Sequence, residues 1–181
     1  LLACPAFSTV IYSQDGIKSL FDNEQYKEII DNYAGKPRTL SAEELTYVAQ
    51  AYLKQEAHND ALTYTNLAIQ KMPKYAKAYY TKALIYSHNR QYNDAIANIQ
   101  KAIEYSPREG EYYALLGDLY QASEQTENAL ANYKKAIAQT NPSERAYYMI
   151  ATIYTDQDNQ EEALKALRIA KSKIIKDKEL Y

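Results

Sequence analysis

The chain has 181 residues, a formal net charge of −2, 20 Tyr, 4 Gly, 5 Pro and a single Cys. So few Gly and Pro favour helices over a β-sandwich or barrel of this length, which would need many tight turns. The near-neutral charge argues against general nucleic-acid binding, because such binding needs clustered Lys and Arg. One Cys excludes an internal disulfide and a Cys-rich zinc site.

Residues 1–13, LLACPAFSTVIYS, form an apolar stretch that ends in small and polar residues. This composition is typical of a secretory signal peptide that lacks its basic start, with cleavage after Ser8 or after Ser13. The first four residues also resemble the bacterial lipobox, in which the Cys, here Cys4, is lipidated. A cleaved signal peptide is the preferred interpretation, and a lipoprotein, an uncleaved anchor and a plain buried segment remain open.

Residues 14–41 predict a degenerate pair of helices, the first over 15–21 and the second over 24–33. The segment QYKEII in the second helix echoes QYNDAI further along the chain. Ser41 is followed three residues later by Glu44, which is the spacing of a capping box. In this motif each side chain accepts a hydrogen bond from the other residue's backbone N–H, so a helix is expected to begin just after Ser41.

A period of 34 residues runs from residue 42 to residue 177, with small and large residues recurring in fixed columns. The small columns are Ala49, Ala83, Gly117 and Ala151, then Ala61, Ala95, Ala129 and Ala163, then Ala68, Ala102, Ala136 and Ala170. The large columns are Leu45, Tyr79, Tyr113 and Tyr147, then Tyr52, Tyr86, Tyr120 and Tyr154, then Leu62, Ile96, Leu130 and Leu164. So many columns in one register indicate an internal repeat.

The unit 76–109 shows why each repeat predicts two helices. Apolar residues three and four apart form one stripe before the polar segment 88–91 and a second stripe after it. Pro107 ends the second helix because it has no N–H to donate. The polar segment is a turn, and we expect its left-handed residue at Asn89, or at Asn159 in the last unit.

These columns resemble the tetratricopeptide repeat, a helix–turn–helix unit of 34 residues. Four such units follow one another without a gap, over 42–75, 76–109, 110–143 and 144–177, and residues 178–181 are left as an overhang. The resemblance implies an all-α protein that folds as a right-handed α-solenoid. One departure is in the turn, which often carries Gly in the family and here has Glu56, Arg90, Glu124 and Asp158.

In this family the first helices of successive units line a concave groove that holds an extended peptide or a partner helix. The resemblance therefore implies a set of groove residues at four positions of each unit. They are Glu43, Thr46, Gln50, Leu53, Lys77, Tyr80, Leu84, Ser87, Glu111, Ala114, Asp118, Gln121, Arg145, Tyr148, Thr152 and Thr155. Tyr80 and Tyr148 are the candidate aromatic anchors. The alternative is that these side chains are merely the solvated surface of a spacer.

The chain offers few groups for catalysis. His58 and His88 occupy different repeat positions near turns, where solvent exposure is expected. No HExxH, CxxC, GxSxG or Walker-type glycine motif occurs. We therefore expect a protein that is not an enzyme and that holds neither a cofactor nor a metal.

The expected function is that of a protein–protein interaction scaffold of the bacterial cell envelope, periplasmic or envelope-associated, whose mature domain does not insert into the membrane. Abundant Tyr with a leader-like start is similar to envelope proteins of Gram-negative bacteria. The alternative is an exported sensor or ligand-binding module of a larger signalling protein that continues beyond Tyr181. A third possibility is a structural adaptor that self-associates through its end repeats.

Overall fold

The computed structural model describes the backbone of residues 16–179 and the side chains of residues 16–172. The leader-like segment 1–13, with Cys4, lies outside the described residues. Within them the chain forms helices and no strand. The helices are α1 (Ile17–Asp22), α2 (Tyr26–Tyr33), α3 (Ala42–Lys54), α4 (His58–Lys71), α5 (Ala76–His88), α6 (Tyr92–Tyr105), α7 (Gly110–Ala122), α8 (Thr126–Ile137), α9 (Glu144–Asp156) and α10 (Gln160–Glu179).

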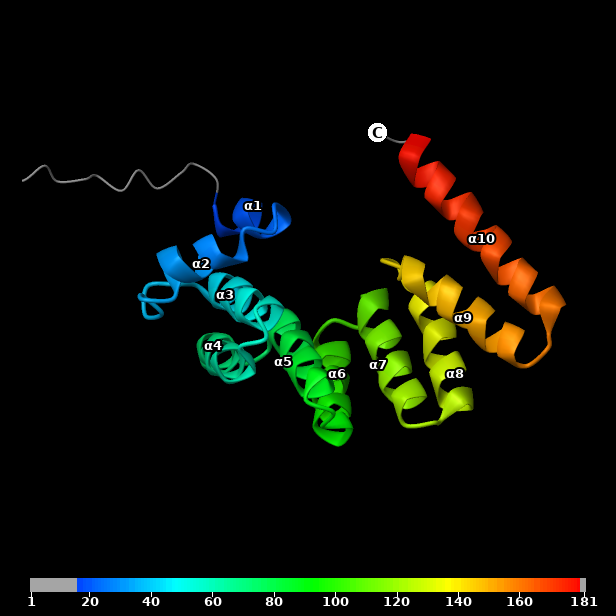
Figure 1. The fold of residues 1–181 in the computed structure, drawn as a ribbon, viewed down its shortest axis with the longest axis horizontal. Helices are drawn as coiled ribbons and strands as arrows, with labels where there is room; N and C mark the ends of the chain where they lie inside the picture. The colour runs from blue at the N-terminus through cyan, green and yellow to red at the C-terminus, as the bar shows by residue number, and fades with distance from the viewer. Residues whose placement is uncertain (1–15, 180–181) are drawn as a thin grey trace, which may run out of the picture.

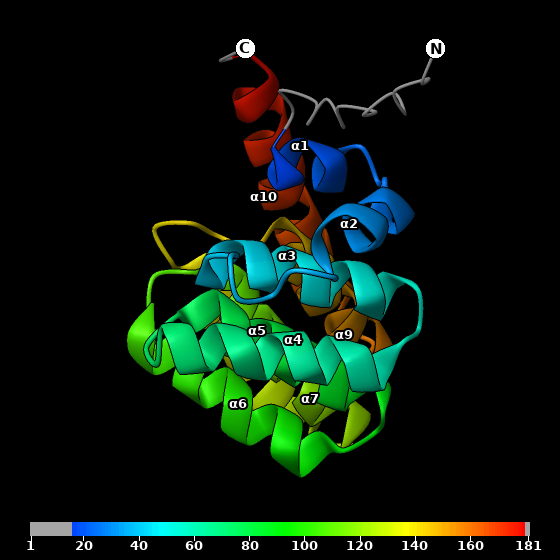
Figure 2. The same ribbon diagram turned by 90° about the vertical axis from the view of Figure 1, so that its left-hand side faces the viewer.

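The helices are arranged as antiparallel pairs that follow one another along the long axis of the molecule (Figure 1). Seen from the N-terminal end, the pair of α3 and α4 lies in front of the pair of α5 and α6 (Figure 2). The odd-numbered helices α3, α5 and α7 also contact one another in turn. The chain is therefore an α-solenoid, as the repeat predicts. None of its described helices is both long and apolar enough to cross a membrane.

The small-residue columns lie between the helices of each pair and between successive pairs. Ala61, Ala95 and Ala129 are fully buried, and Ala163 in the last unit is 5% exposed. Residues without a large side chain let two helix backbones approach closely, and the larger side chains fill the gaps beside them. The alanine columns thus form the core of the solenoid, which runs along its whole described length.

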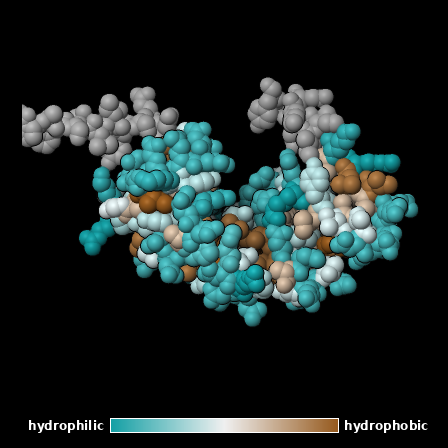
Figure 3. Space-filling model, viewed as in Figure 1, coloured by the Kyte–Doolittle hydropathy of each residue, from teal (hydrophilic) through white to brown (hydrophobic). Residues whose placement is uncertain are grey.

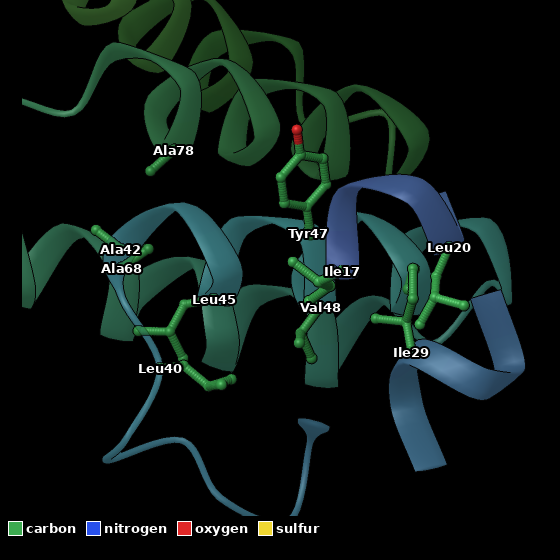
Figure 4. Close-up of a cluster of buried hydrophobic side chains, with 11 residues drawn as sticks. Ile17, Leu20, Ile29, Leu40, Ala42, Leu45, Tyr47, Val48, Ala68 and Ala78 are labelled. Atoms are coloured by element: carbon green, nitrogen blue, oxygen red, sulfur yellow. The ribbon is translucent and has the colours of Figure 1, made fainter. Parts of the chain in front are cut away.

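The first helix pair belongs to the same core. Ile17 and Leu20 of α1 and Ile29 of α2 pack in one buried cluster with Leu45 and Val48 of α3 (Figure 4). The helices are shifted from the segments expected at 15–21 and 24–33, since α1 begins at Ile17 and α2 at Tyr26. Glu24 has φ 58°, which lies outside the α-helical region, so α2 can begin only after this residue.

The start of α3 follows from its local sequence. Ser41 Oγ accepts a hydrogen bond from the Glu44 backbone N–H at 3.1 Å, and Glu44 Oε2 accepts one from the Ser41 N–H at 2.7 Å. This reciprocal pair is the predicted capping box, and it satisfies two N–H groups that have no partner within the helix.

The turns inside the units are built differently from the expectation. The left-handed residues are those of the turn column itself, Glu56, Arg90, Glu124 and Asp158, with φ between 55° and 59°. Asn89 has φ −79°, so the expected left-handed Asn was wrong. At each turn the N–H after the left-handed residue bonds back to the carbonyl of the Tyr in the column Tyr52, Tyr86, Tyr120 and Tyr154. This is a Schellman motif, which satisfies the last carbonyls of the first helix.

The junction between the last two units carries a distinctive loop. The Gly110 N–H donates to the Asn141 carbonyl at 2.7 Å, and the Asn141 N–H donates to the Arg108 carbonyl at 3.2 Å. A Cβ atom at Gly110 would lie 2.4 Å from the Ser143 backbone nitrogen. Only glycine allows the two backbones to approach this closely at the start of α7.

Candidate interaction surface

The solenoid is hollowed between its N-terminal and C-terminal halves, as the space-filling view shows (Figure 3). The odd-numbered helices α3, α5, α7 and α9 lie on the inner side of this curve, and α4, α6 and α8 lie on its outer side (Figure 1). We call the inner side the concave face. Several of the residues predicted for a groove make contacts from one odd-numbered helix to the next, and these contacts define the surface that a partner would meet. They are Gln50, Lys77, Tyr80, Glu111, Asp118 and Arg145.

Between α3 and α5 the contacts are polar. Gln50 Nε2 donates to Thr81 Oγ1 at 3.0 Å. Lys77 Nζ lies 4.5 Å from the centre of the Tyr47 ring and 3.4 Å from its hydroxyl oxygen. An ammonium group above an aromatic face is attracted by the electron-rich ring. Lys77 is therefore held over α3 instead of extending freely into water.

Between α5 and α7 the contact is aromatic. The rings of Tyr80 and Tyr112 stack with their centroids 5.1 Å apart and their planes 29° apart. Burial is the main cause that raises the pKa of Tyr80, and the carboxylates of Glu111 and Asp118 add to it while Arg145 opposes it. Burial likewise raises the pKa of Tyr112. Both phenols consequently stay neutral at any physiological pH and act as hydrogen-bonding, largely apolar surface.

Between α7 and α9 the contact is ionic. Arg145 donates from Nε to Glu111 Oε2 at 3.0 Å and from Nη1 to Asp118 Oδ2 at 2.5 Å. Burial acts to lower the pKa of Arg145, but the two carboxylates outweigh it, so the pKa is raised. Tyr133 of α8 donates its hydroxyl to the other Asp118 oxygen at 2.7 Å, and Ser143 donates to Glu111. We call these five residues the Arg145 cluster.

An open cavity of about 500 Å³ lies beside the Tyr80–Tyr112 stack, at the N-terminal ends of α5 and α7. Its lining residues are Tyr75, Ala76, Lys77, Tyr80, Ser106, Glu109 and Tyr112. We call it the aromatic pocket. Burial raises the pKa of Tyr75 to about 12, so its hydroxyl is also neutral. The walls are tyrosine rings, with one cation, Lys77, and one anion, Glu109, at the edge.

Some predicted groove residues do not reach the surface. Thr46 is 1% exposed, and its hydroxyl donates to the Ala42 carbonyl within its own helix. Ala114 is fully buried and Leu53 is 8% exposed. Gln121 is partly buried, and its Oε1 atom has no hydrogen-bond partner among the described residues. These positions therefore pack between units, and they offer a partner little or no contact area.

Tyr80 and Tyr148, the two expected anchors, differ in their surroundings. Tyr80 is covered by Tyr112 of the following unit, whereas Tyr148 is 46% exposed. Thr152 and Thr155 on the same helix are also exposed. The difference arises because the unit containing Tyr148 is the last one in the described chain. The remaining predicted residues Gln50, Lys77, Leu84, Glu111, Asp118 and Arg145 are partly exposed on the concave face, as is Ser87, and Glu43 is exposed.

Sequence reasoning missed Tyr75 and Tyr112 of the pocket and Tyr133 of the Arg145 cluster. The sequence did contain a signal for Tyr133. This residue stands where earlier units have Thr65 and Ile99, and in its own unit the facing column of small residues has Gly117 in place of Ala. The neighbourhood of the two histidines was missed as well. Because their turns are adjacent in space, the His58 and His88 rings lie 5.9 Å apart, and His58 Nδ1 is 2.5 Å from Asn89 Oδ1.

Comparisons with known proteins find one family model that matches part of the chain and several solved structures with a similar fold. The model of the family described as anaphase-promoting complex, cyclosome, subunit 3 matches residues 88–170. Among solved structures, one of MamA is 22% identical with a TM-score of 0.66, covering 90% of this chain and 92% of that one. MamA 41-end from Desulfovibrio magneticus RS-1 is 17% identical with a TM-score of 0.65, covering 86% and 89%.

A third similar structure is that of YrrB, described as a TPR protein with an unusual peptide-binding site. It is 18% identical with a TM-score of 0.59, covering 81% of this chain and 73% of YrrB. No protein among curated sequences matches the chain. The 34-residue columns, the stacked helix pairs and these likenesses agree on the fold, an α-solenoid of helix pairs like those of tetratricopeptide-repeat structures.

Proposed function

We propose that the chain is a protein–protein interaction scaffold whose concave face binds an extended peptide segment of a partner, with the aromatic pocket as the anchor site. The observation that carries this proposal is the pocket itself, an open cavity of about 500 Å³ walled by Tyr75, Tyr80 and Tyr112. Peptide and ligand sites are typically apolar concavities of this size with a few polar groups at the edge.

The pocket suits a large apolar side chain of a peptide. Tyrosine rings provide wide contact area at small cost in conformational entropy, and aromatic residues are the ones that most often dominate binding energy. Lys77 and Glu109 at the edge offer a cation and an anion to the polar atoms of the peptide backbone or its termini. The YrrB structure supports the choice of ligand, since that related fold is described as having a peptide-binding site.

The contacts along the concave face favour binding because they hold the surface in one arrangement. Arg145 joins α9 to α7, Tyr80 joins α5 to α7, and Gln50 joins α3 to α5. A surface that is already ordered loses little freedom when a ligand binds, so more of the contact energy is retained as affinity.

We propose further that the scaffold works in the bacterial cell envelope, on the strength of the leader-like residues 1–13. A fusion of residues 1–15 to a reporter enzyme that is active only after export tests this, with a start Met and the basic residues that the segment lacks placed before it. We expect activity from the fusion, and loss of lipid labelling without loss of export in a Cys4→Ser variant would identify lipidation. A fusion that stays in the cytoplasm would contradict an envelope location.

The function is tested by selecting peptides from a random displayed library and measuring their affinity for pocket variants. Ser106→Trp fills the pocket without removing any wall, and Ala97→Trp, at an exposed position of α6 that does not line the pocket, is the matched control. We expect Ser106→Trp to weaken the selected peptides at least ~10-fold, the loss of roughly one buried contact group. A library without binders, or equal affinity for both variants, would overturn the proposal.

A further inference from the structure

We propose that the end of the solenoid formed by α9 and α10 is a second interaction surface, which pairs with the same surface of a second copy of this chain. The surface consists of Tyr148, Leu164 and Leu167, and we call it the end face. It is separate from the aromatic pocket, so the resulting tail-to-tail dimer would leave the concave face of each copy free to bind its peptide.

The exposure of the end face is unusual for its place in the repeat. Leu167 is 40% exposed, whereas the residues at the same position of the three preceding units, Thr65, Ile99 and Tyr133, are fully buried. Leu164 is 53% exposed and Tyr148 is 46% exposed. Neighbouring apolar side chains exposed to this extent on a soluble protein generally mark a contact surface.

The second unit shows what such a face binds. Its residues Tyr80, Ile96 and Ile99 are the equivalents, two units earlier, of Tyr148, Leu164 and Leu167, and all three pack in one hydrophobic cluster. The other side of that cluster is α7, through Tyr112, Leu115 and Leu116. The end face is thus a repeat-stacking surface whose covering helix is absent from the described residues, and it is shaped to receive a helix.

The distribution of apolar surface selects a second copy in tail-to-tail orientation. Among the described residues, the large apolar side chains that are strongly exposed are Met72 and four in the last unit. At the opposite end of the solenoid Ile17, Leu20 and Ile29 are buried, so the part of that end which the structure describes offers no strongly exposed large apolar side chain to receive the end face of another copy. A head-to-tail array therefore lacks a complementary surface, whereas two end faces related by a two-fold axis complement each other.

The charges of α10 fit the same arrangement. Its first turn carries Glu161 and Glu162, and the turns after Leu164 carry Arg168 and Lys171, whereas Lys165 pairs with Glu162 of the same helix at 3.5 Å. Two copies of α10 crossing antiparallel at Leu164 and Leu167 bring the acidic start of each helix near the basic stretch of the other. Such pairing steers association and fixes the orientation of the two helices.

The experiment is sedimentation velocity on the full 181-residue chain over a dilution series, with and without end-face substitutions. We expect a reversible dimer, and we expect Leu164→Glu with Leu167→Glu to weaken it at least ~100-fold because two buried leucines are lost. Met72→Glu, which changes another exposed apolar side chain, is the control and should leave the dimer intact. Circular dichroism checks that each variant is folded.

Charge reversal tests the orientation. Glu161→Lys with Glu162→Lys should weaken the dimer roughly tenfold at low salt, and adding Arg168→Glu and Lys171→Glu should restore it. A chain that is monomeric at every concentration, whether because residues 1–15 cover the end face or because nothing does, would overturn the proposal. So would a dimer that the leucine substitutions leave unchanged. Peptide affinity measured on the same leucine variants should not change, which separates this result from the test of the pocket.

Discussion

The ring of Tyr133 occupies the space that a side chain on Gly117 would need. A Cβ atom at Gly117 would lie 2.6 Å from Cε1 of the ring, well inside van der Waals contact. In the preceding unit the same two positions hold Ala83, which is larger than Gly117, and Ile99, which is smaller than Tyr133. A smaller residue at one position is thus matched by a larger residue at the facing position, and the two helices keep their spacing.

Gly117→Ala should destabilise the fold by about 1–3 kcal/mol, because the added methyl group overpacks the contact with Tyr133. Adding Tyr133→Ile recreates the Ala–Ile combination of the preceding unit and should recover much of that loss. Urea denaturation of the two single variants and the double variant measures the coupling between them. Gly35→Ala, where an added Cβ atom has nothing within 4 Å, is the control, and an equal effect at both glycines would refute the packing explanation.

The left-handed turn residues predict a stabilising substitution. Arg90 and Glu124 both have φ 59°, which costs a residue with a side chain about 1–2 kcal/mol relative to the right-handed region. Glycine avoids this cost but loses more entropy on folding, so Arg90→Gly and Glu124→Gly should each raise the free energy of unfolding by up to about 1 kcal/mol. Thermal denaturation is the measurement. Asn89→Gly, at φ −79°, should instead lower the melting temperature, and the reverse order would contradict the turn geometry.

Within the Arg145 cluster, Asp118 should matter more for stability than Glu111. Tyr133 is fully buried, and its hydroxyl donates to Asp118, so Asp118→Ala leaves a buried donor without an acceptor at a cost of about 1–3 kcal/mol. Glu111→Gln keeps an acceptor for the buried Ser143 hydroxyl and removes only the charge of an ion pair with Arg145 that is nearly half exposed, and such pairs contribute about 1 kcal/mol or less. Asp118→Asn keeps an acceptor for the Tyr133 hydroxyl, so its loss of stability in urea denaturation should fall between the losses of the other two variants. Equal losses for Asp118→Ala and Glu111→Gln would show that the buried Tyr133 hydroxyl is unimportant.

Burial of the tyrosines predicts a loss of stability at high pH. The pKa of Tyr75 rises from 10.0 to about 12 on folding, and burial raises the pKa of Tyr112 and Tyr133 as well. Above pH 10 the unfolded chain loses these protons while the folded chain keeps them, so the free energy of unfolding falls as pH rises toward 12. Denaturation at stepped pH should show this fall. Tyr112→Phe should make the fall of the unfolding free energy with pH less steep. An unchanged slope would contradict the raised pKa of Tyr112 as one of its causes.

The sequence columns predicted the helix pairs because repeat spacing records which residues face the core, and burial of the alanines reflects that directly. The turns escaped prediction because Asn preference is a local signal, while the Schellman geometry places the left-handed residue at Arg90 whatever its side chain. Site residues were predicted as positions within one unit. Their contacts, such as Arg145 with Asp118, join neighbouring units and depend on how the units stack.

The repeat pattern also does not record where a unit lies along the solenoid. Tyr80 and Tyr148 occupy the same position of their units, so the pattern treats them as equal anchors. Stacking makes Tyr80 a wall of the aromatic pocket and leaves Tyr148 on the end face. Among the described residues a further unit stacks on Tyr80 and none stacks on Tyr148, and this separates the two roles.

The most direct test of the concave face as the binding surface is a backbone-amide NMR titration of the labelled protein with a selected peptide. The proposed function predicts that the largest shift changes lie in α5 and α7 around Tyr80 and Tyr112, and at Ser106 in the loop before α7. Shift changes confined to the outer helices α4, α6 and α8 would contradict it.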